Sequence, residues 1–283
     1  MLNGGTRIAL IAIVLIGELL LPSAQVEAKV VSLAPFTPWN VNYGEKICTL
    51  RRGFGAKEKP SVIIIDRFGP TDMFQLTVVS DEFKSFEQGK ILTLRFGEQK
   101  PRRIGSVVPG QTSTKTATLF FGNISLSEMI GDENDGWRPE VTSATEASVQ
   151  TISISYFSQE RTFQTGPLDK AFDALRKCTN DLVTTWGLDP KEQATLLRRP
   201  EPHSVPSEWF IPSDYPSAMR NLGKQALVNF RLSVSAQGTP TACEIQSSYN
   251  DKKFDELTCA ALMRRARFSP HSTQKATPCR RST

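Results

Sequence analysis

Between Val41 and Phe157 the chain alternates apolar and polar side chains in one short run after another. Gly, Pro, Asp and Asn residues separate these runs. Such alternation is typical of strands with one buried face, and the separating residues are typical of turns. The clearest runs are Ser61–Phe68, Met73–Ser80, Lys90–Phe96, Lys115–Phe121 and Ser148–Phe157. The sequence therefore predicts an antiparallel β-sandwich or a barrel-like fold for this part of the chain.

A single helix is expected to close this β-rich domain. Gly166-Pro167 is a helix start signal and Gly187 is a stop signal. Six apolar residues recur between them at helical spacing: Leu168, Ala171, Phe172, Leu175, Cys178 and Leu182. We expect the β-rich domain to span residues 29–187 and its helix to bury this face.

The composition changes after the helix. Residues 188–208 are rich in proline, which predicts a semi-rigid linker. A second domain, residues 209–283, has a strand at Ala226–Ser235, a turn and a return strand at Thr241–Ser247. A helix at Asp255–Ala266 follows, with Asp255 as its expected N-cap. A hairpin covered by a helix predicts a small two-layer α+β unit, so the whole chain is expected to be mainly β with α+β.

The first 28 residues have the pattern of a secretory signal peptide. Arg7 precedes an apolar stretch, Ile8–Leu21, and the segment ends in small residues near Ala28. The stretch is shorter than the roughly 20 residues that span a bilayer. We therefore expect cleavage before Lys29 and a periplasmic location; the alternative is an uncleaved inner-membrane anchor with the chain facing the periplasm.

Export gives the five cysteines a structural meaning, because thiols in an oxidising compartment tend to pair. Proximity within each domain favours the bridges Cys48–Cys178 and Cys243–Cys259, which leaves Cys279 as the odd thiol. The chain has no C-x-x-C motif and only two histidines, which stand far apart. Structural disulfides are therefore favoured over metal ligands, and no metal or cofactor is expected.

The charge is concentrated at one end. The net charge is +5, and residues 209–283 carry eleven basic and five acidic side chains. An acidic partner is therefore expected to meet the second domain. Export and the lack of aromatic residues beside the basic cluster argue against nucleic acid as that partner.

Residues 209–270 resemble the C-terminal domain of TonB-type energy transducers. The resemblance rests on motifs that keep the family's order and nearly its spacing: Tyr215-Pro216, Gly223, Val228, the V-N-F-R-L-S-V-S-A-Q-G segment, Ser247-Ser248, Phe254-Asp255 and Arg267-Phe268-Ser269-Pro270. The thirteen residues after Pro270 are hardly apolar, so the family's last strand is expected to be truncated or lost.

The resemblance implies protein recognition rather than catalysis. In that family a receptor segment adds as a strand to the sheet edge after the R-F-x-P motif, which is β-augmentation. The implied partner is an outer-membrane receptor or another envelope protein, in transport or energy transduction; a homodimer stays possible through an exchanged strand or Cys279. The implied partner-binding residues are Tyr215, Phe230, Arg231, Arg264, Arg265, Arg267 and Phe268.

The alternative function is an enzyme or ligand-binding module in the β-rich domain. The Gly105–Thr112 segment is close to a phosphate loop, but Gln111 replaces the essential lysine, which favours a simple turn. The two histidines, His203 and His271, lie in the linker and the tail and are not oriented bases. No catalytic residue is therefore assigned, and the enzyme alternative requires carboxylates that converge in the β-rich domain.

Overall fold

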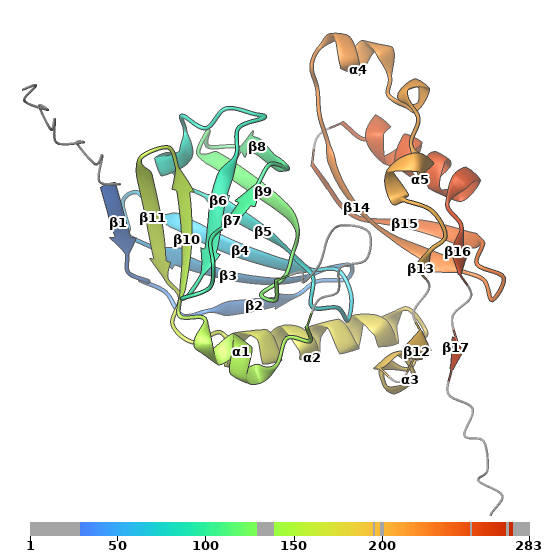
Figure 1. Cartoon of the computed structure of the whole chain (residues 1–283), viewed down its shortest axis with the longest axis horizontal. Helices are drawn as coiled ribbons and strands as arrows, with labels where there is room; N and C mark the ends of the chain where they lie inside the picture. The colour runs from blue at the N-terminus through green and yellow to red at the C-terminus, as the bar shows by residue number, and fades with distance from the viewer. Residues whose placement is uncertain are drawn as a thin grey trace, which may run out of the picture.

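The computed structural model describes residues 29–128, 139–194, 196–198, 201–249, 251–269 and 272–273. Its β-rich domain consists of two open sheets (Figure 1). One sheet has the order β2 (Asn40–Tyr43), β3 (Cys48–Phe54), β4 (Ser61–Arg67), β5 (Phe74–Val79), β9 (Ala117–Ile124) and β8 (Val107–Gln111). The other has the order β1 (Lys29–Leu33), β11 (Gln159–Gln164), β10 (Thr151–Tyr156), β6 (Leu92–Phe96) and β7 (Arg102–Ile104). The predicted mainly-β class is confirmed, and the described strands do not close into a barrel.

The core of this domain lies between the two sheets, where aromatic rings from opposite sheets meet edge to face. Phe54 and Phe163 have ring centroids 5.4 Å apart, and Phe74 and Phe96 are 6.2 Å apart. This packing follows from the period-two pattern, because every second side chain of each strand points into the space between the sheets.

Helix α2 (Asp169–Thr185) closes the sandwich as the sequence predicts, and the short helix α1 (Ser143–Ser148) packs beside it. Phe172 of α2 contacts Phe74 at 5.7 Å between ring centroids. The expected bridge between Cys48 of β3 and Cys178 of α2 is present. The helix is therefore fixed to the sheet by apolar packing and by a covalent bond.

The segment 188–208, expected to be a proline-rich linker, contains short elements of secondary structure. Helix α3 (Pro190–Ala194) and the 3-10 turn η2 (Pro206–Trp209) flank two short strands, β12 (Leu196–Arg198) and β13 (Glu201–Pro202). These strands pair antiparallel with β17 (Ser272–Thr273) and β16 (Phe268–Ser269), respectively. Proline is tolerated there because β13 is a short edge strand.

The C-terminal domain has the predicted plan of a hairpin covered by a helix. Its elements are η3 (Pro212–Asp214), α4 (Ser217–Asn221), β14 (Leu227–Val234), β15 (Pro240–Tyr249) and α5 (Lys253–Arg265). Trp209, Leu262 and Ala266 form its small buried core, against which Phe230 and Phe268 pack. The expected bridge between Cys243 of β15 and Cys259 of α5 joins the two layers.

Two local expectations are wrong. Helix α5 begins two residues before Asp255, with Lys252 at the N-cap position, and the carboxylate of Asp251 accepts the Lys253 N–H at 3.0 Å. The Gly105–Thr112 segment is mostly strand rather than turn, because Val107–Gln111 forms β8 and pairs with β9.

None of the described helices is long and apolar enough to cross a membrane. The proposed signal segment and Cys279 lie outside the described residues.

Candidate partner-binding site

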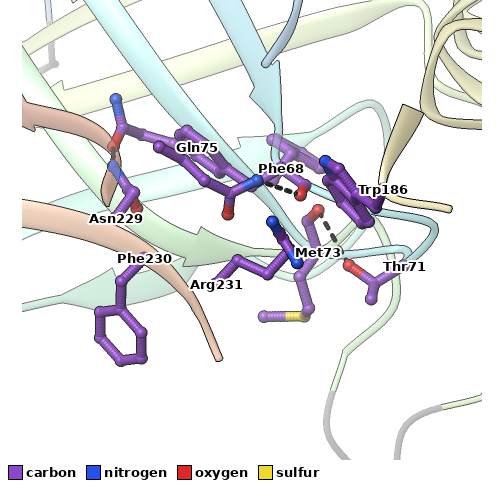
Figure 2. A pocket seen from close by; sticks show the side chains of 11 residues that line it. Phe68, Thr71, Met73, Gln75, Trp186, Asn229, Phe230 and Arg231 are labelled. Carbon is purple, nitrogen blue, oxygen red and sulfur yellow. Dashed lines mark hydrogen bonds between the residues drawn. The ribbon is translucent and has the colours of Figure 1, made fainter. Parts of the chain in front are cut away.

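The β14–β15 hairpin is covered on both faces. Phe230 and Leu232 point toward the core under α5, as alternation along a strand requires. Asn229 and Arg231 point the other way, toward the β-rich domain (Figure 2). In Figure 1 the hairpin accordingly lies between α5 and the β-rich domain. We call the contact between the hairpin and the β-rich domain the seam.

Amide side chains supply most of the polar contacts across the seam. Asn229 Nδ2 donates to Gln75 Oε1 at 2.8 Å, and Gln246 Nε2 donates to the carbonyl oxygens of Phe68 at 2.8 Å and Lys46 at 3.1 Å. Lys46 also forms an ion pair with Glu244 of β15. Gln75 and Gln246 are 6% and 9% exposed. Buried amides of this kind are tolerated because their hydrogen bonds are made within the seam.

Aromatic packing closes one end of the seam. The rings of Phe120 and Tyr249 lie 4.7 Å apart between centroids. Gly110 lies beneath them: a Cβ atom there would stand 2.6 Å from the Tyr249 hydroxyl oxygen and 2.9 Å from the Phe120 ring. The seam therefore requires a residue without a side chain at this position of β8.

The seam also buries a carboxyl group. Asp66 of β4 is 8% exposed and lines a cavity of about 190 Å³ that it shares with Gln75, Asn229 and Tyr249. Burial raises the pKa of Asp66 to about 6. The hydrogen bond that Thr49 Oγ1 donates to the carboxylate, 2.7 Å long, lowers the pKa and so opposes this rise. Desolvation thus outweighs the single hydrogen bond that favours the carboxylate.

The residues expected to bind a partner are not brought together on one surface. Phe230 and Phe268 belong to the small core, and the ring of Phe268 lies 5.3 Å from that of Trp209. Tyr215 packs on Phe254 at 5.5 Å and is 38% exposed. The main role of these three aromatic side chains is therefore to stabilise the C-terminal domain. Of the three, Tyr215 is the one with a large exposed part.

The four arginines have three different environments. Arg264 and Arg265 both form ion pairs with Asp214, whose pKa is lowered first by the Ile211 N–H and then by Arg265. Arg267 is exposed beside β16 and donates to the carbonyl of Ala266 at 2.7 Å. Arg231 lies on the far side of the hairpin, in the seam. Arg267 is therefore the one of the four that is exposed without an ion pair among the described residues.

Strand β16 joins the hairpin turn to the linker. The Phe268 N–H donates to the carbonyl of Gly238 at 2.9 Å, and the His203 N–H donates to the carbonyl of Arg267 at 2.8 Å. Gly238 has φ +78°, and a Cβ atom there would stand 1.8 Å from the Phe268 carbonyl oxygen. Glycine is thus required both by the turn and by the close approach of β16. Phe268 and Ser269 of the R-F-S motif are thus paired with β13 of the same chain, and β17, which follows the motif, is paired with β12.

Two further buried charges of the β-rich domain, Arg67 and Glu146, lie near α2. Arg67 is 2% exposed, and its guanidinium lies 4.8 Å from the centre of the Phe172 ring. Glu146 is fully buried and accepts a hydrogen bond from Arg176 at 2.5 Å; burial raises its pKa and Arg176 opposes that rise. Among the described residues, Glu146 hydrogen-bonds no other carboxyl group. No group of three or more described His, Cys, Asp or Glu residues is placed to hold a metal ion.

The geometry of the C-terminal domain by itself defines its class. The domain is a disulfide-linked α+β unit in which a helix covers a two-stranded hairpin and is followed by a short strand. Residues 212–282 match the family model of the Gram-negative bacterial TonB protein C-terminal domain. The expected resemblance is therefore confirmed for this part of the chain. The family is one of energy transduction and transport rather than of enzymes. No curated protein and no solved structure gave a match.

Sequence reasoning missed the seam. The signal for it was weak: Asp66, Gln75 and Thr77 are polar residues on the outer face of β4 and β5, where a sandwich normally meets solvent. All three are nonetheless less than 9% exposed. Only the position of the hairpin, which no local pattern encodes, explains their burial.

Proposed function

We propose that this chain is an exported protein, facing the periplasm, whose C-terminal domain binds an envelope protein such as an outer-membrane receptor. The observation that carries the proposal is the match of residues 212–282 to the TonB C-terminal family, on a domain with the helix-covered hairpin in place. The excess of basic residues in 209–283 supports an acidic partner surface.

Strand addition at the hairpin edge is the binding mode that we propose. The β14–β15 sheet has two strands, and neither outer edge forms a ladder with another described strand. Unpaired edges present backbone N–H and C=O groups that a partner segment can pair with. Since both faces of the hairpin are covered, the edges are the part of it that a partner strand reaches without rearrangement.

Site-specific photo-crosslinking in cells tests the proposal with the full chain. A photoreactive residue at Arg267, which is exposed next to β16, is expected to form an adduct with an outer-membrane protein. The matched control is Lys57, exposed in a turn of the β-rich domain, which is expected to form none. Adducts at Lys57 but not at Arg267, or no adduct at either position, would contradict the proposal.

The intact mass of the protein from its native cells tests the location. A periplasmic product that begins at Lys29 supports export with cleavage. The full 31.4 kDa chain in the membrane fraction would instead favour the anchored alternative.

A further inference from the structure

The seam contains a second cavity, beside the amide hydrogen bonds described above. Its volume is about 310 Å³, and both domains line it. The β-rich domain contributes the apolar walls, which include Phe68, Met73 and Trp186. Strand β14 contributes Arg231, whose side chain extends toward Trp186 while Phe230 points away (Figure 2). The volume is at the lower end of the range for small-molecule sites.

The amide side chains around this cavity have hydrogen-bond partners in the protein. Gln75 accepts from Asn229 and donates to Thr77 Oγ1 at 3.2 Å. Gln246 donates to two backbone carbonyl groups. The donors of these two glutamines are therefore engaged within the seam.

Arg231 is different. Its guanidinium lies 4.6 Å from the centre of the Trp186 ring, and no hydrogen bond or ion pair joins it to another described residue. Its Nε atom is buried without a partner. Glu244, opposite Arg231 in the β14–β15 register, forms its ion pair with Lys46; Lys46 lowers the pKa of Glu244 most, and Arg231 adds a weaker charge interaction. A buried donor without an acceptor is destabilising, and more so when it is charged. Among the side chains that line the cavity, Arg231 thus supplies a buried cationic donor that no described acceptor uses.

We propose that this cavity binds a small monocarboxylate that carries an apolar or aromatic group. The carboxylate accepts hydrogen bonds from Arg231, since guanidinium and carboxylate geometries match. The apolar group packs against Phe68, Met73 and Trp186. Arg231 is the one cation among the residues that line the cavity, which suits a single negative charge better than a phosphate.

Ligand binding at this site is expected to stabilise the docking of the two domains, because each domain supplies one half of the site. A ligand held by Arg231 and Trp186 contacts both sides of the seam and binds only when the hairpin is docked. Binding to one state stabilises that state by mass action. The ligand is therefore expected to protect the docked arrangement against heat and against proteolysis in the linker. This inference does not depend on the identity of the envelope partner.

The test compares the binding of acids with that of their uncharged amides to the chain from Lys29 to Thr283. The probes are 3-phenylpropionate, indole-3-acetate and hexanoate, and each is compared with its primary amide. Ligand-observed NMR measures the binding of each probe, and thermal melting measures its effect on Tm. We expect at least one acid to bind and to raise Tm, and its amide to bind about tenfold more weakly or worse, because a hydrogen bond to a charged group contributes about 1.5–3 kcal/mol.

Variants assign the binding to Arg231. Arg231→Gln is expected to weaken binding of the acid about tenfold or more, whereas Arg231→Lys, which keeps the charge, is expected to retain part of it. Arg103→Gln, at the exposed middle position of strand β7, is the matched control and is expected to bind as the unaltered protein does. Circular dichroism shows whether each variant is folded. Equal binding of acid and amide, equal binding by Arg231→Gln, or no binding of any probe at millimolar concentration would overturn the proposal.

Discussion

Asp66 offers the sharpest test of how the seam is built. Its carboxyl group is buried beneath the hairpin, where it accepts a hydrogen bond from Thr49. Replacing Asp66 with Asn keeps the size and an oxygen that accepts from Thr49, but it removes the titration. The variant therefore isolates the cost of burying a charge in this place.

The magnitude follows from the pKa of Asp66, which is raised from 3.8 to about 6. Below 3.8 the folded and unfolded states both hold the proton, and above about 6 both have released it. Between these values only the unfolded state is ionised, so the stability of the protein falls as pH rises. Two units of pKa correspond to about 3 kcal/mol. Asp66→Asn is thus expected to match the unaltered protein near pH 3.8 and to be about 3 kcal/mol more stable above pH 6.

Urea unfolding of both proteins at a series of pH values measures this difference. Other groups titrate in the same range, but their effects cancel between the two proteins. Asp181→Asn, on the exposed side of α2, is the matched control, and as a surface substitution it is expected to change the free energy of unfolding by less than about 0.5 kcal/mol. A constant difference between Asp66→Asn and the unaltered protein, or one that shrinks as pH rises, would refute the account of the seam.

Two further changes test the C-terminal domain. Replacing Cys243 and Cys259 with Ser opens a loop whose ends are 16 residues apart, which is expected to lower the free energy of unfolding by about 3 kcal/mol, measured by urea titration. Gly238→Ala meets both a positive φ and the Phe268 carbonyl oxygen, so its loss is expected to exceed the roughly 1 kcal/mol of a positive-φ alanine. Gly89→Ala, with the same φ of +78° and open space around it, is the control; an equal loss at both positions would show that β16 does not pack on the turn.

The sequence was sufficient wherever a structure repeats locally. Alternation identified strands such as β4 and β5, and helical spacing identified α2 with the face that it buries. The hairpin and its bridge, Cys243–Cys259, followed from a turn signal and a short separation along the chain. In each case the residues that meet are either neighbours in sequence or members of one periodic pattern.

The sequence was insufficient wherever distant segments cover each other. Gln75 and Asn229 are 154 positions apart, and each is an ordinary surface residue by its local pattern. Strand β13 forms only because β16 supplies the backbone groups that it pairs with. Arg231 was expected on the partner-facing surface for the same reason: alternation shows which residues share a face of a strand, but not which face meets another domain.

The covered hairpin leaves two ways to engage a partner, and pH separates them. A partner strand that adds to a free hairpin edge leaves Asp66 buried, so its affinity is expected to be indifferent to the ionisation of Asp66. A partner that uses the inner face must first open the seam, which exposes Asp66 to water. Opening is favoured above the pKa of about 6, because the carboxylate is then released from a desolvated site. Tyr249 is the other residue with a titratable side chain that lines this cavity. Tighter binding at pH 7.5 than at pH 5 that Asp66→Asn abolishes would therefore identify the inner face, and unchanged binding would identify the edge.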